Sequence, residues 1–208
     1  MFITFEGIDG SGKSTQIELL ARRLEMQKHE VLIVREPGGT QISERIRDLL
    51  LDMRHGEMNA HTELLLFSAS RSQLVIERII PALRRGTVVI ADRFHDSTTA
   101  YQGYGRGLDI TAIDHVHAMA THGLMPDLSV FLDIPIEESL RRRDDRSGQR
   151  DRMESADHAF FERVQNGYRF IASTSPARFR VIDGTPPADD VAETIWGWVV
   201  AGLEKASV

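Results

Sequence analysis

The 208-residue sequence has no cysteine and only three lysines, and none of its apolar runs is longer than four residues. Without cysteine there is no disulfide, no thiolate nucleophile and no cysteine-ligated metal, which suits a reducing compartment. A run such as Val88–Ala91 is far shorter than the roughly 20 residues that span a bilayer. The apolar start Met1–Phe5 carries no basic residue and is interrupted by Glu6, so a secretory leader is not expected. We therefore expect a cytoplasmic protein that has no membrane segment.

Positive charge is also in deficit, since 25 basic against 31 acidic residues give a net charge of −6. This balance argues against nucleic acid as a partner, although it permits a local basic site. One segment departs from the average, because residues 141–152 hold six arginines against three aspartates. With 41% apolar residues the chain can form a core. Its length favours a single domain spanning residues 1–208.

Short β-branched runs alternate with segments of helical period, an order typical of β/α units around a parallel sheet. Ile17, Leu20 and Leu24, for example, share one helical face after the first strand. A longer helical pattern covers residues 61–85, where Pro81 is expected to kink or end the helix. The five predicted strands are Phe2–Glu6, Val31–Arg35, Thr87–Asp92, Leu128–Asp133 and Arg178–Asp183.

The first strand is followed by Gly7–Ser14, which fits the phosphate-binding pattern G-x-x-x-x-G-K-[ST] between a strand and a helix. Its glycines permit backbone torsions closed to other residues, so that several N–H groups can point at one phosphate. The helix start and Lys13 add positive charge, and the Ser14 hydroxyl can bind Mg²⁺. The residues predicted to bind a nucleoside triphosphate are Gly7, Ile8, Asp9, Gly10, Ser11, Gly12, Lys13, Ser14 and Thr15.

A second metal ligand is expected at Asp92, because the apolar strand before it ends in a carboxylate as a Walker B strand does. Asp92 would order Mg²⁺ either directly or through water. A GTPase is disfavoured, since the guanine-specifying pattern N-K-x-D does not occur.

Further segments stand out in order along the chain: FEGIDGSGKST at Phe5–Thr15, REPGGT at Arg35–Thr40, LLLFSASRSQ at Leu64–Gln73, DRFHDSTTAYQGYGRG at Asp92–Gly107, PDLSVFLD at Pro126–Asp133 and DRME at Asp151–Glu154. As an ordered set they closely resemble bacterial thymidylate kinases. The resemblance implies a doubly wound, five-stranded parallel sheet of the P-loop kinase fold, with a LID segment at about residues 141–152. It also implies a homodimer, formed through helices such as those near residues 61–80 and 111–122.

The reaction that the resemblance implies is transfer of the γ-phosphoryl group of Mg²⁺·ATP to dTMP, giving dTDP for dTTP biosynthesis. ATP and dTMP are thus the expected partners, and Mg²⁺ is the expected cofactor. The acceptor is already an anionic phosphate, so alignment and charge neutralisation, rather than a general base, should carry catalysis.

The acceptor site implied by the resemblance draws on several segments. Arg93 would clamp the acceptor phosphate, because a planar guanidinium can hold two oxygens at once. Phe67 and Arg71 are four residues apart and share one helix face, so Phe67 would stack on thymine and Arg71 would reach its carbonyl edge. The expected substrate-binding residues are Asp9, Glu36, Phe67, Arg71, Arg93, Thr98, Tyr101 and Gln102.

Several of these residues have distinct implied roles. Gln102 would hydrogen-bond the thymine edge, Tyr101 would exclude a ribose 2′-hydroxyl, and Asp9 would meet the 3′-hydroxyl of the sugar. Arg35 and Arg47 are expected to face the same cavity. The glycines that follow Gln102 leave open a purely structural role for its loop.

Catalysis would be completed by Lys13, Arg93 and a cation from the arginine-rich LID, which closes over ATP. Arg146 and Arg150 are the candidates for that cation, and the spacing of the segment leaves open which of them acts. The alternative for this segment is a solvated helix end whose arginines form ion pairs.

Two other functions remain open from the residues alone. A different nucleotide or deoxynucleoside kinase would prefer an acceptor other than dTMP. A non-catalytic nucleotide-binding module would bind ATP without releasing ADP when dTMP is added.

Overall fold

The structure is a computed structural model that describes residues 1–144 and 151–206. Its strands form a parallel sheet in the order β2-β3-β1-β4-β5, which confirms the expected five-stranded parallel sheet. The strands are β1 (Phe2–Glu6), β2 (Val31–Arg35), β3 (Val88–Asp92), β4 (Leu128–Asp133) and β5 (Phe179–Asp183).

Two strands begin one residue later than predicted. The Thr87 amide donates to the Ala82 carbonyl at 3.1 Å, and the Arg178 amide donates to the Ser175 carbonyl at 3.3 Å. Both amides therefore belong to the turns that precede β3 and β5.

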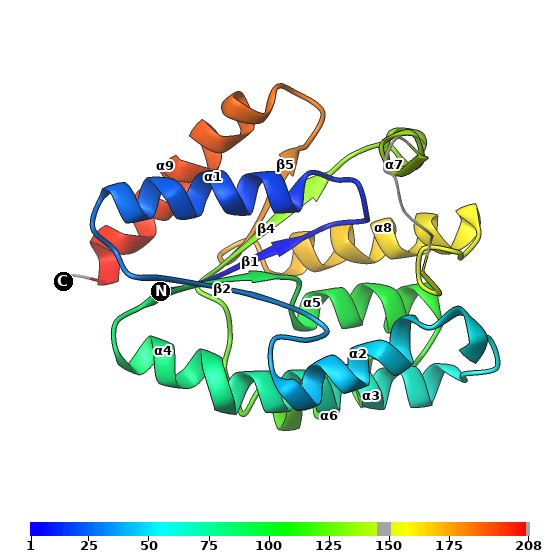
Figure 1. The fold of residues 1–208 in the computed structure, drawn as a ribbon. Coiled ribbons are helices and arrows are strands. Elements are labelled where there is room, and N and C mark those ends of the chain that lie inside the picture. The colour runs from blue at the N-terminus through cyan, green and yellow to red at the C-terminus, as the bar shows by residue number, and fades with distance from the viewer. Residues whose placement is uncertain (145–150, 207–208) are drawn as a thin grey trace.

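Helices connect the strands and cover both faces of the sheet (Figure 1). Within residues 1–144 and 151–206, no helix combines the length and the apolar character needed to cross a bilayer. The helices are α1 (Lys13–Met26), α2 (Gln41–Leu51), α3 (Ala60–Leu74), α4 (Ile80–Arg84), α5 (His95–Thr98), α6 (Ile110–Ala120), α7 (Ile136–Asp144), α8 (His158–Thr174) and α9 (Ala188–Ala206), with the 3-10 helix η1 (Met53–His55) and the π-helices η2 (Val75–Ile79) and η3 (Thr99–Gly105).

The long helical pattern around Pro81 is divided, as expected. A π-helical stretch, η2, separates α3 from α4, and Pro81 stands in the first turn of α4. A proline is tolerated at that place because its missing N–H has no partner there in any case.

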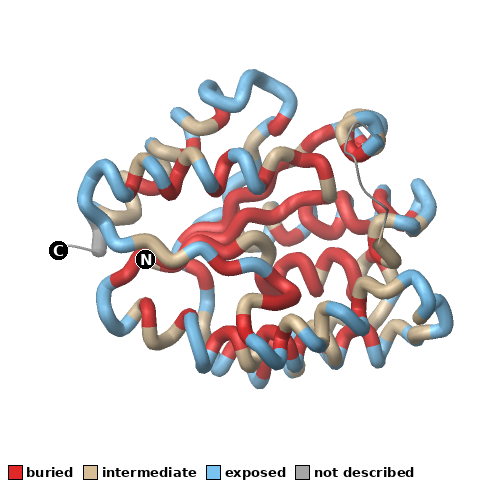
Figure 2. Tube along the Cα trace, viewed as in Figure 1, coloured by how far each residue is buried: buried red, intermediate tan, exposed pale blue. Residues whose placement is uncertain are grey.

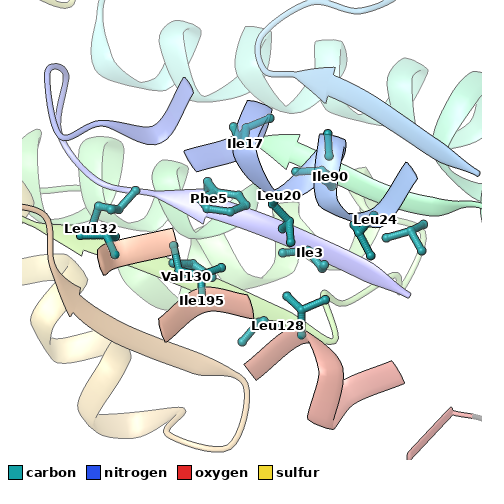
Figure 3. Packing of buried hydrophobic residues seen from close by; sticks show 14 residues of the cluster. Ile3, Phe5, Ile17, Leu20, Leu24, Ile90, Leu128, Val130, Leu132 and Ile195 are labelled. Atoms are coloured by element: carbon teal, nitrogen blue, oxygen red, sulfur yellow. The ribbon is translucent and has the colours of Figure 1, made fainter. Parts of the chain in front are cut away.

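The buried sheet lies between the two helical layers, whose outer surfaces are exposed (Figure 2). On one face, Ile3 and Phe5 of β1 pack with Ile17 of α1 and Ile195 of α9 (Figure 3). On the other face, Phe2 of β1 packs against helices α3 and α4 through a separate cluster. Because successive strand residues point to opposite faces, Glu6 lies on the same side as Phe2.

The three strands β2, β3 and β1 end at the same edge of the sheet. Asp92 of β3 is in register with Arg35 of β2 and with Phe5 of β1. The residues that follow these strands therefore meet at one edge, where open α/β sheets bind their ligands.

Candidate active site

The glycine-rich turn between β1 and α1 requires glycine at its first position. Gly7 has φ +138°, and a Cβ there would lie 2.7 Å from the Leu132 carbonyl oxygen and 2.9 Å from Ser11 Oγ. Lys13 Nζ closes the turn by donating to the carbonyls of Gly7 and Ile8, each at 3.1 Å. Contacts within the chain thus fix both the shape of the turn and the position of the Lys13 side chain.

Lys13 has an unusual electrostatic environment for a lysine. Burial lowers the pKa of Lys13 to about 8, an effect that the Arg93 cation reinforces and that Asp92 and Asp9 oppose. A partly desolvated ammonium group of this kind interacts strongly with phosphate oxygens.

Helix α7 covers the turn from the other side. Ser139 Oγ donates to the Asp9 carbonyl at 2.6 Å, and Arg142 Nη1 donates to the carbonyls of Gly10 at 3.3 Å and Gly184 at 3.2 Å. A Cβ at Gly10 would lie only 3.0 Å from the Ser139 carbonyl oxygen. Sequence analysis did not identify Ser139 or Arg142 as neighbours of the turn, because both lie about 130 residues away along the chain.

Arg93 directly follows β3 and is held in the left-handed backbone region, with φ +72°. Its Nη2 donates to Asp9 Oδ1 at 2.9 Å and to the Tyr101 hydroxyl at 3.2 Å. Its Nη1 donates to the hydroxyls of Ser97 at 3.3 Å and Tyr168 at 3.2 Å. The guanidinium group is therefore held on two sides beside the glycine-rich turn.

Asp9 remains ionised beside these cations. Burial alone would raise its pKa, but the charges of Arg93 and Lys13 lower the pKa of Asp9 to about 2. The pairing of Asp9 with Arg93 joins the phosphate turn to the residues after β3.

Glu6 lies beneath this region, fully buried at the end of β1. It accepts hydrogen bonds from the Phe94 amide at 3.0 Å and from Ser97 Oγ at 2.6 Å, and so fixes the turn that carries Arg93. Burial and the nearby Asp96 carboxylate raise the pKa of Glu6 to about 8. Sequence analysis did not assign Glu6 a role, although a glutamate that ends an apolar strand directly before the glycine-rich turn was a signal.

The candidates for binding the base are Arg71 and Phe67, which both belong to α3. Arg71 is 1% exposed; its Nε donates to Glu36 Oε2 at 2.8 Å, and its Nη2 donates to Thr98 Oγ1 at 2.9 Å. Its remaining nitrogen, Nη1, is buried and has no hydrogen-bond partner within the part of the chain that the structure describes. Phe67, one helical turn earlier on α3, is half-buried.

One cavity of about 240 Å³ is lined by residues of the glycine-rich turn and by the candidates for binding the base. Of the residues predicted for the site, Gly7, Ile8, Ser11 and Thr15 do not line this cavity, and Arg146 and Arg150 lie outside the described residues. The predicted residues that line it are Asp9, Gly10, Gly12, Lys13, Ser14, Arg35, Glu36, Arg47, Phe67, Arg71, Asp92, Arg93, Thr98, Tyr101 and Gln102. The lining residues not predicted are Pro37, Leu51, Phe94, Ser97, Asp151 and Met153.

The ion-pair alternative for the arginine-rich segment is partly realised at its start. Arg141 and Arg142 both pair with Glu138, at 2.7 Å and 2.6 Å. Arg152, at the end of the segment, instead donates to Glu63 at 2.6 Å and to the Leu50 carbonyl at 2.8 Å. Arg142, through Gly10 and Gly184, and Arg152 thus link separate elements as well as carrying charge.

The parallel sheet carries a glycine-rich turn, and Lys13 of that turn lines the same cavity as Arg93. These features together define a P-loop phosphotransferase that acts on small molecules. Comparison with known proteins narrows the class. The family model described as thymidylate kinase matches residues 5–195. The chain belongs to the thymidylate kinase family.

Individual relatives cover almost the whole chain. A thymidylate kinase of Desulforudis audaxviator is 46% identical over 205 residues, which is 98% of this chain and 92% of that protein. A thymidylate kinase of Chlorobium chlorochromatii is 48% identical over 205 residues, covering 94% of this chain and 92% of its own. The crystal structure of thymidylate kinase from Ehrlichia chaffeensis aligns with a TM-score of 0.79 at 35% identity, over 96% of this chain and 97% of that one.

Proposed function

We propose that the chain transfers the γ-phosphoryl group of ATP to dTMP and releases ADP and dTDP. The observation that carries this proposal is that Lys13, Arg93 and Phe67 line the same cavity. A triphosphate tail held by the glycine-rich turn and a second phosphate held by Arg93 would then face each other across a short distance. Positioning and charge neutralisation are what phosphoryl transfer to an anionic acceptor requires.

The donor side of the site is the turn Gly7–Thr15. Its backbone amides and the start of α1 would receive the phosphates of ATP, and Lys13 would neutralise them. The 3.1 Å bonds from Lys13 to the turn carbonyls would be exchanged for bonds to phosphate oxygens.

The acceptor side would hold dTMP between its phosphate and its base. Arg93 would take the phosphate, while Asp9 would accept from the 3′-hydroxyl of the sugar. Phe67 would stack on the thymine ring, and Arg71 and Gln102 would bond its polar edge. Two further residues support this arrangement, because Glu36 and Thr98 each accept a hydrogen bond from Arg71.

Tyr101 has a position suited to sugar selection. Its hydroxyl lies 3.2 Å from Arg93 Nη2, and its ring lies under the Arg93 guanidinium, 5.0 Å from it. A ring fixed beside the phosphate clamp would crowd a 2′-hydroxyl and so favour deoxyribose.

We also propose Mg²⁺ as the cofactor, with Ser14 and Asp92 as its protein ligands. Both residues line the cavity, and oxygen donors of this kind suit Mg²⁺, which usually takes one or two protein oxygens plus water and phosphate. No group of three or more His, Cys, Asp or Glu residues that could hold a metal occurs among residues 1–144 and 151–206. Phosphate oxygens would therefore have to complete the site. When bound, Mg²⁺ would offset negative charge on the phosphates.

The arginine-rich residues 141–152 are proposed as a LID within a single domain, 1–208. α7, whose last residues belong to this segment, already contacts the glycine-rich turn through Ser139 and Arg142. That contact supports a segment placed to close over ATP, with Arg146 or Arg150 as the added catalytic cation.

We propose a homodimer that associates through α3 and α6. Leu65 of α3 and Met119 of α6 are 59% and 71% exposed, and Ile76 of the adjoining η2 is 51% exposed. Light scattering after gel filtration should give the mass of a dimer, and Leu65→Ser with Met119→Ser should lower it to that of a monomer. A monomeric wild-type chain would contradict the proposal.

A cytoplasmic location is proposed as well, because the chain has no cysteine.

The test of the reaction is a coupled ADP-release assay with Mg²⁺·ATP and a panel of acceptors. We expect dTMP to be preferred over dUMP, UMP, CMP, AMP and thymidine, and Lys13→Ala to abolish turnover. Preference for another acceptor would favour a different nucleotide kinase. ATP binding without ADP release would favour a non-catalytic binding module.

A further inference from the structure

A buried glutamate outside the cavity contacts the base-binding side of the site. Glu63 of α3 is fully buried and is not one of the residues that line the cavity. Its carboxylate accepts hydrogen bonds from Gln102 Nε2 at 2.9 Å, from Arg106 Nε at 3.1 Å and from Arg152 Nη1 at 2.6 Å. Of these three donors, only Gln102 lines the cavity.

The two arginines keep the Glu63 carboxylate ionised. Burial would raise its pKa, but hydrogen bonds from Arg106, Gln102 and Arg152 lower the pKa of Glu63 below its usual value. An ionised carboxylate can only accept hydrogen bonds. The part of the Gln102 amide that contacts Glu63 must therefore be the NH₂ group. An amide oxygen turned toward Glu63 would place two acceptors in contact.

This constraint decides which end of the Gln102 amide is left for the cavity. Gln102 is 1% exposed, and its Oε1 has no hydrogen-bond partner in residues 1–144 and 151–206. The amide therefore presents an acceptor to a bound base. Arg71, on the same cavity, has the buried and unpartnered Nη1, which can only donate.

A donor and an acceptor that line one cavity are complementary to one class of pyrimidine. Thymine and uracil offer the O4 acceptor next to the N3–H donor. Cytosine offers the reverse, an N4 amino donor next to the N3 acceptor. A base with the reversed pattern would leave buried polar groups facing like groups, which sites of this kind reject strongly.

We propose that Glu63 is a positioning residue that sets base specificity: it locks the Gln102 amide with the oxygen toward the base, so that the site selects pyrimidines with an N3–H and rejects cytosine. The proposal rests on the proposed function, in which the acceptor is a pyrimidine deoxynucleoside monophosphate. Arg106 and Arg152 act behind Glu63, since they hold its charge in place.

The test compares the acceptor preference, kcat/KM for dTMP over kcat/KM for dCMP, in a matched pair of variants. Arg106→Gln removes one ion-pair partner but keeps the Glu63 carboxylate. Arg106→Gln with Glu63→Gln differs only by replacing that carboxylate with an amide, and it keeps the net charge that the wild-type cluster has. Gln at position 63 can either donate or accept, so the Gln102 amide becomes free to turn over.

We expect the preference of Arg106→Gln to stay within about threefold of wild type. Adding Glu63→Gln should lower it by at least about tenfold. The loss should come chiefly from a higher KM for dTMP, with kcat changed less, because Glu63 acts on base binding. Gln102→Leu, which removes the amide, gives the lower limit that the double variant should approach.

Circular dichroism melting identifies a temperature at which the variants are folded. Glu63→Gln alone, compared with wild type, provides the same test should the double variant unfold. A folded variant that lacks the Glu63 carboxylate and keeps the wild-type preference would overturn the proposal. Failure of the proposed function would look different, because the wild-type chain itself would then release no ADP with dTMP.

Discussion

Arg93→Lys is the substitution that most directly tests the phosphate clamp. It keeps the positive charge and an unbranched stem, and lysine has no greater difficulty than arginine in the left-handed backbone at φ +72°. What changes is the donor geometry. The two terminal nitrogens of Arg93 bond Asp9 and Tyr101 on one side and Ser97 and Tyr168 on the other, at 2.9–3.3 Å. One ammonium nitrogen cannot reach both sides and a phosphate at once.

The expected loss follows from the number of bonds to phosphate. A fork that grips two phosphate oxygens becomes a single point charge, so at least one charge-assisted hydrogen bond is lost, worth about 1.5–3 kcal/mol. Since about 1.4 kcal/mol corresponds to a factor of ten in rate, kcat/KM for dTMP should fall by about 10- to 140-fold.

Steady-state kinetics with varied dTMP and calorimetric titration of ATP separate the two sides of the cavity. Arg93→Lys should weaken the use of dTMP while leaving the Kd for ATP within about threefold of wild type. The acceptor assignment of Arg93 would be refuted if the variant kept wild-type kcat/KM for dTMP. It would also be refuted if ATP binding weakened as much as dTMP use.

Three further outcomes are expected. Gly7→Ala should lower the free energy of unfolding by about 1–3 kcal/mol in urea titrations, because its Cβ would lie 2.7 Å from a carbonyl oxygen. Gly56→Ala should change the free energy of unfolding little, because a Cβ at Gly56 has nothing within 4 Å. Equal effects of the two substitutions would contradict this reasoning. Phe67→Leu should raise KM for dTMP about tenfold through lost stacking and leave KM for ATP unchanged, and a rise in both would place Phe67 elsewhere. Folding raises the pKa of Glu6 to about 8. The contribution of Glu6 to the free energy of unfolding of the wild type should therefore be largest below about pH 4.5 and should fall as the pH rises to about 8. Glu6→Gln should flatten that fall by about 1–3 kcal/mol between pH 5 and pH 9, and parallel stability curves would refute the shift.

The fold was predictable because its central strands β1, β3 and β4 are buried on both faces. A run such as Val88–Asp92 contains almost only apolar residues, and covering helices require such runs in a parallel sheet. The register that brings Asp92 level with Arg35 was not predictable, since pairing between strands far apart in sequence leaves no periodic trace.

The cavity was predictable where a short motif carries the chemistry. The turn that holds Lys13 is local, and the helix spacing of Phe67 and Arg71 is local as well. That these segments share one cavity with Arg93 depends on the chain as a whole. The ordered motifs implied this meeting through their resemblance to a family, whereas spacing alone did not.

The partners of the buried carboxylates were beyond sequence reasoning for a different reason. Glu6 is bonded to the Phe94 amide 88 residues away, and Glu63 to Arg152 89 residues away. Nothing near Glu63 in the sequence distinguishes it from an exposed glutamate, and Glu6 is marked only by its place between an apolar strand and the glycine-rich turn. Only the three-dimensional pairing explains why an ionisable group is tolerated there.

The cationic site of this acidic chain is stable because its charges are matched within the fold. Arg93 pairs with Asp9 at 2.9 Å and Arg71 pairs with Glu36 at 2.7 Å. Without such partners, guanidinium groups buried at the wall of one cavity would repel each other and lose hydration. Asp9 and Glu36 line the same cavity as Arg93 and Arg71, and the pairing leaves both guanidinium groups at the cavity wall. A nucleotide phosphate or base would therefore meet donors whose positions are fixed before it binds, which is the condition under which electrostatic catalysis is effective.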